Sequence, residues 1–385
     1  MRFGIFYEHQ LPRPWTEEGE FELLQQSLDQ IELADRLGYD YAWEVEHHFL
    51  EEYSHSSAPE VFLGAASQRT RNIRLGHGII QLTTNHPARV AERVSTLDLV
   101  SKGRVELGLG ESATVTELHP FDVRFRDKRA VWEDMVRATL PMFWNDAWEY
   151  HGEYVDFPLR NVIPKPRQKP HPPLWVACSQ LETIRMCGRR GMGALGFQFV
   201  SAEAAKAWVH AYYNAYTREL DKLCGYETNP NIAVVSQFMC APTDEEARAR
   251  ADGSSFFQFA LGYYATHAPG NPGEIRLWEE YLKFRETPKG QAQRVGGLIG
   301  SPDTIRERLR RFEDSNVDQV ILLNQAGKNT HDDICSSLEL FATAVMPEFH
   351  EREPGHQLWK QAVLAGDIEL DEIDTEPYAT PRRGL

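Results

Sequence analysis

The chain has 385 residues, of which 42% are hydrophobic, and a formal net charge of −16, so it can bury the core of one large barrel or of two domains. This charge repels nucleic acid and anionic lipid, and no run approaches the roughly 18 apolar residues of a membrane helix, so we expect no nucleic-acid or membrane partner. No charged-then-apolar leader follows Met1, and the five cysteines show no CxxC spacing, which predicts a cytoplasmic protein without a signal peptide.

The first third of the chain alternates strand and helix without a hairpin turn. The predicted strands are "RFGIF", "YDYAWEVE", "IRLGHGIIQL" and "RVELGLG". Helices are predicted between them, from Thr16 to Leu37 with Gly38 as its cap, over "PEVFLGAASQRT", and from Pro87 to Gly103. Such alternation requires parallel strands joined by right-handed crossovers.

The alternation resumes after residues 148–173, which are rich in proline and aromatic residues and predict a small hairpin followed by an extended segment. The later strands are "LWVAC", "ALGFQFV", "IAVVSQFMC" and "QVILLNQ". Eight strands alternating with helices predict an α/β fold, a TIM (β/α)8 barrel. A doubly wound sheet is the alternative, although it rarely needs eight strands in such regular succession.

Two further segments exceed a minimal barrel. Residues 251–300 carry Gly270, Pro272 and Gly273 at their centre, which predicts a lid loop over the mouth of the barrel. From residue 351 the chain turns acidic, and we expect a mobile tail or one that packs on a neighbouring subunit. The predicted organisation is a barrel over 1–350, with insertions at about 148–173 and 251–300, and an acidic C-terminal extension over 351–385.

Three histidines follow the second predicted strand in "YDYAWEVEHHFLEEYSH". In a TIM barrel this position is the catalytic end. His47 and His48 are adjacent, so they point to opposite faces of a strand and supply at most one barrel-facing metal ligand. We therefore predict no metal site. His47 is the candidate acid–base residue, with Glu44 or Glu46 fixing its tautomer, whereas His48 and His55 are secondary or simply hydrogen-bonded loop residues.

Three other strand ends carry polar or glycine residues. His86 precedes the proline that starts a helix, where it can cap that helix or serve the site. "GLGES" permits close approach of a flat ring or a phosphate to the backbone. Ser179 has Glu182 at capping-box spacing, so it is expected to cap a helix whose N-terminus could bind an anion. Arg129 is a candidate cation for the same anion, or an ordinary surface arginine.

Together these pieces resemble the bacterial luciferase-like flavin-dependent monooxygenases. The resemblance spans about residues 1–350. It rests on "MRFGIF", "WEVEHHF", "LGHGIIQLTTNHPARVAERVSTLDLVSKGR", "RDKRAVWE", "WVACS" and "GSPDTIRERLRRFEDSNVDQVILL". It implies a luciferase-like TIM barrel that binds reduced FMN (FMNH2), which reacts with O2 to a C4a-peroxyflavin and oxygenates a small organic substrate.

The resemblance also assigns residues. His47 matches the family's catalytic histidine, and Glu46 precedes it in the cofactor site. Gly78 and Ile79 fall where luciferases have a non-proline cis peptide against the flavin ring, and Phe197 falls at a large aromatic near the isoalloxazine.

The phosphate end of the cofactor site shows both matches and departures. Arg129 and Ser179 match phosphate-contacting positions. Among cofactor-site positions, Gly110 replaces a reactive cysteine and Cys178 a glutamate. Glu111 replaces a phosphate-binding arginine, so that part of the cradle must differ, and light emission is not implied.

Since the chain has no NAD fingerprint, a separate NAD(P)H:flavin reductase is expected as a partner. The other expected partners are O2 and a small-molecule substrate. We also expect a homodimer or a larger homo-oligomer. One alternative is an F420-dependent oxidoreductase that transfers hydride on the same barrel. Others are a non-catalytic flavin-binding protein and a metal-dependent barrel hydrolase.

Overall fold

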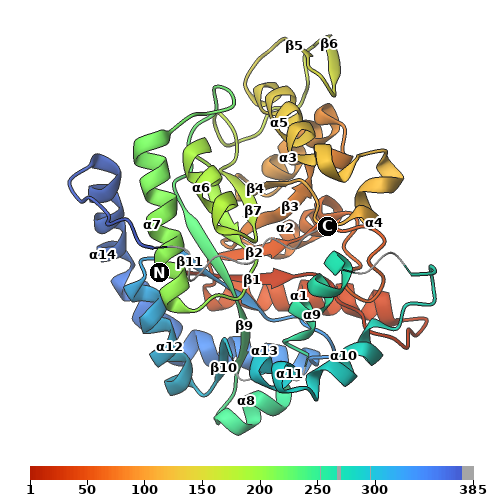
Figure 1. Ribbon diagram of the computed structural model, residues 1–385, viewed down its shortest axis with the longest axis vertical. Coiled ribbons are helices and arrows are strands. Elements are labelled where there is room, and N and C mark those ends of the chain that lie inside the picture. Colours follow the sequence, from red (N-terminus) through yellow and green to blue (C-terminus); the bar gives the residue numbers. More distant parts are fainter. Residues whose placement is uncertain (252, 267–269, 295, 375–385) are drawn as a thin grey trace.

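The computed structural model describes residues 1–251, 253–266, 270–294 and 296–374. Within these residues, eight parallel strands close into a barrel that helices cover on the outside (Figure 1). In order around the barrel the strands are β1 Arg2–Tyr7, β2 Tyr41–Glu44, β3 Arg74–Gln81, β4 Val105–Gly110, β7 Leu174–Cys178, β8 Gly193–Gly196, β9 Ile232–Cys240 and β11 Gln319–Leu323. The predicted TIM barrel is confirmed.

β1 closes the barrel by pairing with the last strand. Gly4 lies opposite Tyr41 of β2 on one side and opposite Ile321 of β11 on the other. A second closing pair joins β8 to β9, which excludes the doubly wound sheet because that sheet has two free edges. All the barrel strands run in one direction, so their carboxyl ends form a single rim.

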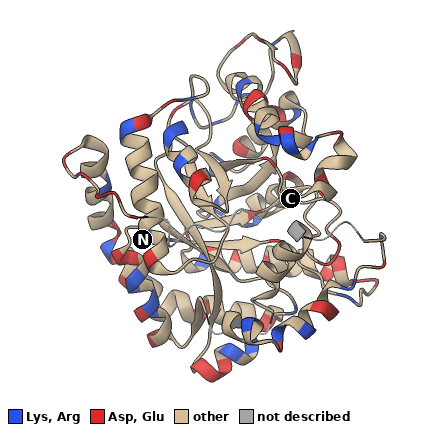
Figure 2. Ribbon diagram, in the orientation of Figure 1, with Lys and Arg blue, Asp and Glu red and all other residues tan. Residues whose placement is uncertain are grey.

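Helices fill the crossovers between the strands. The longer ones are α1 Gly19–Leu37, α2 Pro59–Arg69, α3 Pro87–Val100, α5 Lys128–Thr139, α6 Leu181–Arg190, α7 Ala202–Glu219, α12 Pro302–Asp314 and α13 His331–Ala344. Short ones are η1 Leu82–Thr84, α4 Val115–Leu118, η2 His119–Phe121, η3 Phe125–Asp127 and η4 Leu140–Phe143. Gly38 ends α1 in the left-handed conformation at φ 86°, as predicted. Charged side chains lie mainly on the helices and loops rather than on the strands (Figure 2).

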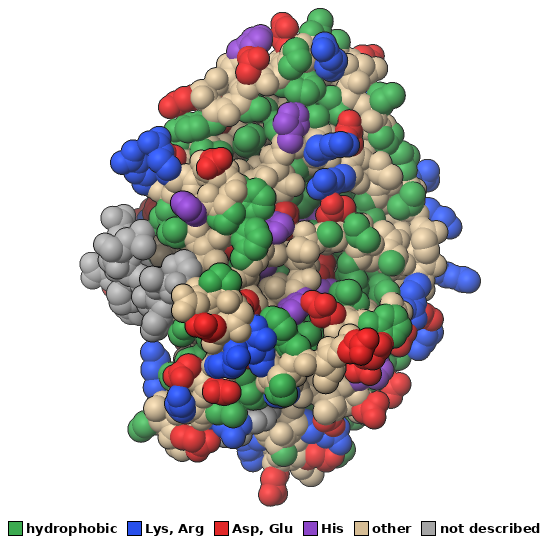
Figure 3. Space-filling model, turned by 90° about the vertical axis from the view of Figure 1, so that its right-hand side faces the viewer, with side chains coloured by type: hydrophobic (Ala, Val, Ile, Leu, Met, Phe, Trp, Pro, Cys, Tyr) green, Lys and Arg blue, Asp and Glu red, His purple; other side chains and the backbone are tan. Residues whose placement is uncertain are grey.

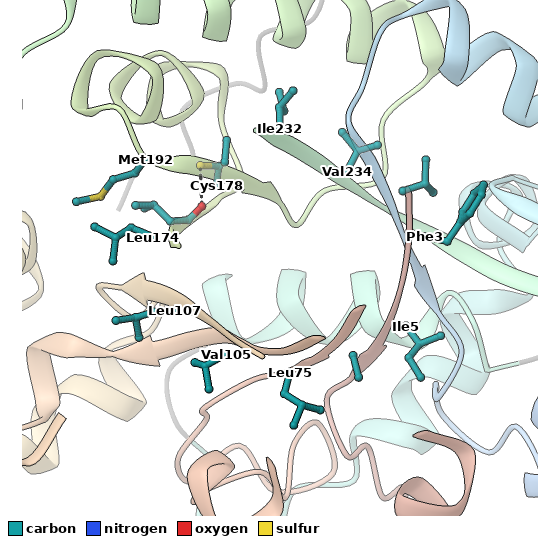
Figure 4. Packing of buried hydrophobic residues seen from close by; sticks show 14 of the residues in the cluster. Phe3, Ile5, Leu75, Val105, Leu107, Leu174, Cys178, Met192, Ile232 and Val234 are labelled. Carbon is teal, nitrogen blue, oxygen red and sulfur yellow. Dashed lines mark hydrogen bonds between the residues drawn. The ribbon is translucent and has the colours of Figure 1, made fainter. Parts of the chain in front are cut away.

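The strands carry two layers of buried side chains because alternate residues face opposite sides. One set packs between the sheet and the helices, and includes Phe3, Ile5, Leu75 and Val105 (Figure 4). The other set fills the barrel interior; it includes Phe6, Trp43, Trp175, Leu195 and Val235. Each such side chain stabilises the fold by about 1.5–3 kcal/mol through burial.

An antiparallel hairpin lies within the predicted first insertion, and projects at the top of Figure 1. Its strands are β5 Trp148–His151 and β6 Asp156–Arg160. Asp134 of α5 fastens it to the barrel by accepting hydrogen bonds from the Tyr150 hydroxyl at 2.5 Å and the Tyr154 N–H at 2.8 Å.

The segment expected to hold a lid loop is largely helical in its described part. It contains α9 Phe256–Thr266, α10 Leu277–Arg285, α11 Pro288–Arg294 and the short strand β10 Leu298–Gly300, and α8 Asp244–Arg250 precedes it. Gly270, Pro272 and Gly273 lie between α9 and α10. Side chains of both helices belong to the same buried cluster as the barrel interior, so this segment packs onto the barrel.

The chain continues from the barrel into α14 Met346–Ala365, so the expected boundary at 350/351 falls inside a helix. Residues that follow α14 return to α7 of the same chain: His210 Nδ1 lies 2.9 Å from the Asp371 carbonyl. Residues 375–385 of the predicted tail lie outside the described residues. In the part of the chain that is described, no helix is long and apolar enough to cross a membrane.

Candidate functional site

His47 lies at the carboxyl rim of the barrel, three residues after β2 ends. Its backbone N–H donates to the Ser56 carbonyl at 2.8 Å, which fixes the loop. Its Nδ1 lies 2.8 Å from Glu117 Oε1, and its Nε2 lies 3.5 Å from Glu8 Oε2. The imidazole therefore stands between two carboxylates, one from the end of β1 and one from α4.

Glu117 is fully buried and held by a dense set of donors. Its carboxylate accepts hydrogen bonds from Ser112 Oγ at 2.9 Å, Thr114 Oγ1 at 3.0 Å and the His48 N–H at 3.2 Å, and from Gln81 Nε2. Burial alone would raise the pKa of Glu117, but the charge of His47 and these donors hold that pKa below its ordinary value. Glu117 is therefore an anion that orients His47.

The two carboxylates shift the protonation of His47. Burial disfavours the imidazolium, but Glu117 and Glu8 outweigh it and raise the pKa of His47 to about 9. His47 is therefore a cation in neutral solution. In Glu8, burial dominates and raises the pKa of the carboxyl to about 7, even though His47 and the Tyr53 hydroxyl favour its anion.

The carboxylates predicted to hold His47 have other partners. Glu46 Oε1 lies 3.0 Å from His48 Nε2, and Glu44 Oε1 lies 2.8 Å from His9 Nδ1. The prediction that Glu44 or Glu46 fixes the His47 tautomer is wrong, because Glu117 approaches from another crossover.

His55 lies apart from this cluster. Its Nδ1 is 2.8 Å from Glu20 of α1, and its ring packs edge-on against Trp15. His86 caps α3, accepting from the Ala88 N–H at 3.3 Å, which is one of its two predicted roles. Among the described residues, no group of three or more His, Cys, Asp or Glu side chains has the geometry of a metal site.

An apolar floor is linked to His47 through the rings of Tyr53 and Phe257. The Gly78–Ile79 peptide is cis, and Phe197, which follows β8, packs against Phe6 with ring centroids 5.0 Å apart. A Cβ on Gly78 would lie 3.6 Å from Phe197 Cζ. The floor thus joins residues from three strands that are far apart in sequence.

The glycines of "GLGES" let β4 pack closely against the part of β3 that forms this floor. A Cβ on Gly110 would lie 2.3 Å from Ile79 Cδ1, and one on Gly108 would lie 2.1 Å from the His77 carbonyl oxygen. The close approach predicted for this backbone is therefore made by the neighbouring strand β3.

Helix α9 covers the barrel mouth. Phe257 lies 6.0 Å from Phe6, 6.1 Å from Tyr53 and 5.5 Å from Phe199, measured between ring centroids. Figure 3 shows the face of the molecule that α4, α9 and α10 border, where histidine side chains are visible among hydrophobic and acidic ones. The polar cluster and the apolar floor therefore share one partly covered mouth.

The predicted phosphate-binding residues lie around the ends of β4 and β7. Arg129 Nη2 contacts Glu111 Oε1 at 2.5 Å, while its buried Nε has no hydrogen-bond partner among the described residues. Ser179 is exposed. The N-cap residue of α6 is Gln180, which makes no side-chain hydrogen bond to the helix, so the predicted capping box at Ser179 is wrong.

The Cys178 side chain points away from the mouth into the helix-side core (Figure 4), where its Sγ lies 3.2 Å from Cys187 Sγ. Burial raises the pKa of this thiol well above its ordinary value, and nearby Arg129 opposes the shift. Arg129 contacts Glu111, which follows β4, the neighbour of β7 in the barrel, and its role in binding an anion stays a prediction.

Two residues of the site were missed in the sequence. Glu117 lies in "TVTE", whose Thr114 caps α4 by accepting from the Glu117 N–H at 3.2 Å, and this capping-box spacing was a usable signal. Glu8 directly follows β1, so the strand-end rule that selected His47 also applied to it.

Comparison with known proteins identifies the family of the chain. Residues 1–319 match the description "luciferase-like monooxygenase". The chain belongs to the luciferase-like monooxygenase family. This luciferase-like protein is 24% identical over 360 residues to the oxygenase component of the flavin-dependent trigonelline monooxygenase of Acinetobacter baylyi, covering 91% of this chain and 96% of that one.

Solved structures share the fold of this luciferase-like protein. One is the oxygenating constituent of 3,6-diketocamphane monooxygenase from Pseudomonas putida, a type II Baeyer–Villiger monooxygenase in complex with FMN; the TM-score is 0.71 at 20% identity, over 90% of this chain and 98% of that one. Another is the coenzyme F420-dependent tetrahydromethanopterin reductase of Methanopyrus kandleri, with a TM-score of 0.66 at 19% identity, over 90% and 99%.

Proposed function

We propose that this protein is the oxygenase component of a two-component system that uses reduced FMN and O2 to oxygenate a small organic substrate. The observation that carries the proposal is the imidazole of His47, clamped between Glu8 and Glu117 and linked to the apolar floor. Such a mouth combines a flat hydrophobic surface with a fixed proton donor, which is what a flavin and a reacting oxygen atom need.

The residues at the mouth fit a flavin. The floor formed by Gly78, Ile79 and Phe197 suits an uncharged ring system. The buried Nε of Arg129, which has no hydrogen-bond partner among the described residues, suits the phosphate. Ser179, which directly follows β7, would lie at the same end of the cofactor. Glu111 opposes that phosphate, because it already neutralises Arg129. When bound, reduced FMN would supply the electrons that activate O2.

The chain's own groups then act on protons and water. His47 holds a proton at Nε2 in neutral solution, and Glu117 fixes the ring through Nδ1. The imidazolium would stabilise negative charge on an oxygen at the rim and would donate a proton to it. The α9 aromatics around Phe257 would exclude water from that space.

The test is a binding titration followed by an oxygen assay. Anaerobic titration with FMNH2, FMN and F420 should show the tightest binding for FMNH2. With a separate flavin reductase and NADH, oxygen uptake should then depend on one class among ketones, sulfides and aromatic compounds. Steady product formation from NADH and FMN without any reductase would contradict the two-component proposal.

An F420-dependent oxidoreductase is the second candidate, favoured by the likeness of the barrel to the F420-dependent reductase. Preferential binding of F420 in the same titration, with hydride transfer and no oxygen uptake, would select it. A cytoplasmic location and a homodimer or larger homo-oligomer stay predictions.

A further inference from the structure

Four buried carboxylates meet three imidazoles at the barrel mouth. Glu44 pairs with His9 at 2.8 Å and Glu46 with His48 at 3.0 Å. The third imidazole, His47, pairs with Glu117 at 2.8 Å, so Glu8 is the fourth carboxylate, without an imidazole partner of its own.

Glu8 is placed to exchange a proton with this cluster. It is 2% exposed, and its Oε1 accepts a hydrogen bond from the Tyr53 hydroxyl at 2.9 Å. Its Oε2 makes no hydrogen bond among the described residues and lies 3.5 Å from His47 Nε2. A buried carboxylate without a full partner is costly as an anion, so it takes up a proton more readily than an exposed one.

We propose that Glu8 is the base of the barrel mouth, while His47, protonated between Glu8 and Glu117, is its acid. His47 and Glu8 thereby divide the acid and base roles that a lone imidazole would combine. In this arrangement Glu8 takes a proton from, or returns it to, whatever occupies the mouth, and the imidazolium supplies positive charge and a proton to donate.

The surroundings of Glu8 favour this division. The groups that face it are Glu44 from the end of β2, His47 and Tyr53 from the following loop, and Glu117 from α4. Two of these are carboxylates that resist a further negative charge, and only His47 is cationic. Burial and these anions raise the pKa of Glu8 to about 7, so Glu8 changes charge in the neutral range.

The test reads His47 directly in the flavin-free protein. Histidine labelled with ¹³C at Cε1 is followed by NMR from pH 5 to 10, and the His47→Gln variant assigns the signal. We expect a small step near neutral pH, when Glu8 ionises, and a main step near pH 9. In Glu8→Gln the neutral step should vanish, and the main step should fall by about one pH unit or more.

Two further variants sharpen the outcome. Glu20→Gln removes the carboxylate beside His55 on the outer surface and should leave the His47 curve unchanged. Tyr53→Phe deletes the donor that favours the Glu8 anion, so the neutral step should move to higher pH. The inference would be overturned if the wild-type His47 signal shows a single step near pH 6.5. It would also be overturned if neither Glu8→Gln nor Tyr53→Phe changes the His47 titration curve.

The link between Glu8 and turnover rests on the proposed function, whereas its titration does not. If no flavin binds but the neutral step is found and depends on Glu8, the proposed function fails and this inference stands. If FMNH2 binds and His47 titrates independently of Glu8, this inference fails and the proposed function stands. With an active system, Glu8→Gln should also remove the neutral limb of the pH profile of kcat.

Discussion

His47 is positioned by groups from three separate parts of the chain: Glu8 after β1, Ser56 in its own loop and Glu117 in α4. Its partners also set its charge, because two nearby carboxylates favour the imidazolium more than burial opposes it. The side chain at this position is therefore a proton donor in neutral solution and becomes a base only in alkaline solution.

Replacing His47 by alanine should keep the fold and the affinity for reduced flavin but lower turnover by about 10²–10⁴-fold, the usual contribution of general acid–base catalysis. In the wild type, turnover should decline as the pH rises through about 9, because the folded-state imidazole loses its proton there. Single-turnover kinetics with saturating FMNH2 measure both effects.

His55→Ala is the matched control, since that imidazole bonds Glu20 outside the cluster. Its turnover should equal that of the wild type. Full activity of His47→Ala would remove the catalytic assignment and leave flavin binding untouched.

The ion pair between Arg129 and Glu111 predicts a second residue-scale effect. Glu111→Gln removes the carboxylate that competes with a phosphate for the guanidinium, so FMN should bind more tightly. Arg129→Ala should weaken FMN binding by about 1.5–3 kcal/mol, the strength of a charge-assisted hydrogen bond.

Riboflavin separates this effect from a change in the fold, because it lacks the phosphate. Isothermal titration should show that riboflavin affinity is nearly the same in the wild type and both variants. Equal changes for FMN and riboflavin would place Arg129 and Glu111 outside the phosphate site.

The strand-end rule found His47 in the sequence because position alone decides which residues reach the rim. It did not find its partner, because Glu117 lies 70 residues further along the chain and only the pairing of β2 and β4 with β3 brings the two together. Glu46 was the natural expectation, being adjacent, but adjacent side chains on an extended chain point apart.

At the scale of elements, α14 shows how the chain after the barrel is fastened. Asp318, at the start of β11, accepts hydrogen bonds from Ile232 N at 2.7 Å and the Tyr213 hydroxyl at 2.7 Å. Its other oxygen lies 2.8 Å from His356 Nε2 and 3.0 Å from Lys360 Nζ, both on α14. Burial alone would raise the pKa of Asp318, but the charge of Lys360 and the hydrogen bonds from His356 and Tyr213 hold it well below its ordinary value.

Asp318→Asn should lower the free energy of unfolding by about 3–5 kcal/mol, because it leaves Lys360 buried without its anion. Urea denaturation followed by circular dichroism measures the loss. Glu313→Gln, which removes a more exposed partner of Arg352, should cost only about 0–1 kcal/mol. Similar losses in the two variants would contradict the anchoring role.

The barrel strands were predictable because each is a short apolar run, separated from the next strand by a segment long enough to hold a helix. The segment that covers the mouth was predicted, but as a loop; its helical form was not predictable. Helix α9 is apolar on most sides, as in "FFQFALGYY", so its sequence carries no amphipathic stripe to mark it, and glycine and proline between α9 and α10 suggested a loop instead.

At the scale of the whole molecule, exposed apolar side chains lie on two neighbouring helices. Val61 on α2, and Leu99 and Val100 on α3, are all exposed, and Gln68 Nε2 ties the helices by donating to the Val100 carbonyl at 3.1 Å. Exposed apolar side chains on two neighbouring helices favour association with a second copy of the chain.

Light scattering coupled to size exclusion should therefore find a dimer or larger assembly of the wild type at micromolar concentration, and Val61→Glu should shift it toward the monomer. Leu159→Glu, at another exposed apolar position on the β5–β6 hairpin, is the control and should leave the mass unchanged. A monomeric wild type would contradict self-association through α2 and α3.

The pairing of β1 with β11 has a consequence for biosynthesis. A ribosome releases β1 first, yet one edge of that strand stays unpaired until β11 emerges. At about 5–20 residues per second, the roughly 310 residues between them take roughly 15–60 s to translate. During that interval one edge of β1 stays unpaired, so added chaperone should raise the yield of folded protein more than a stronger promoter would.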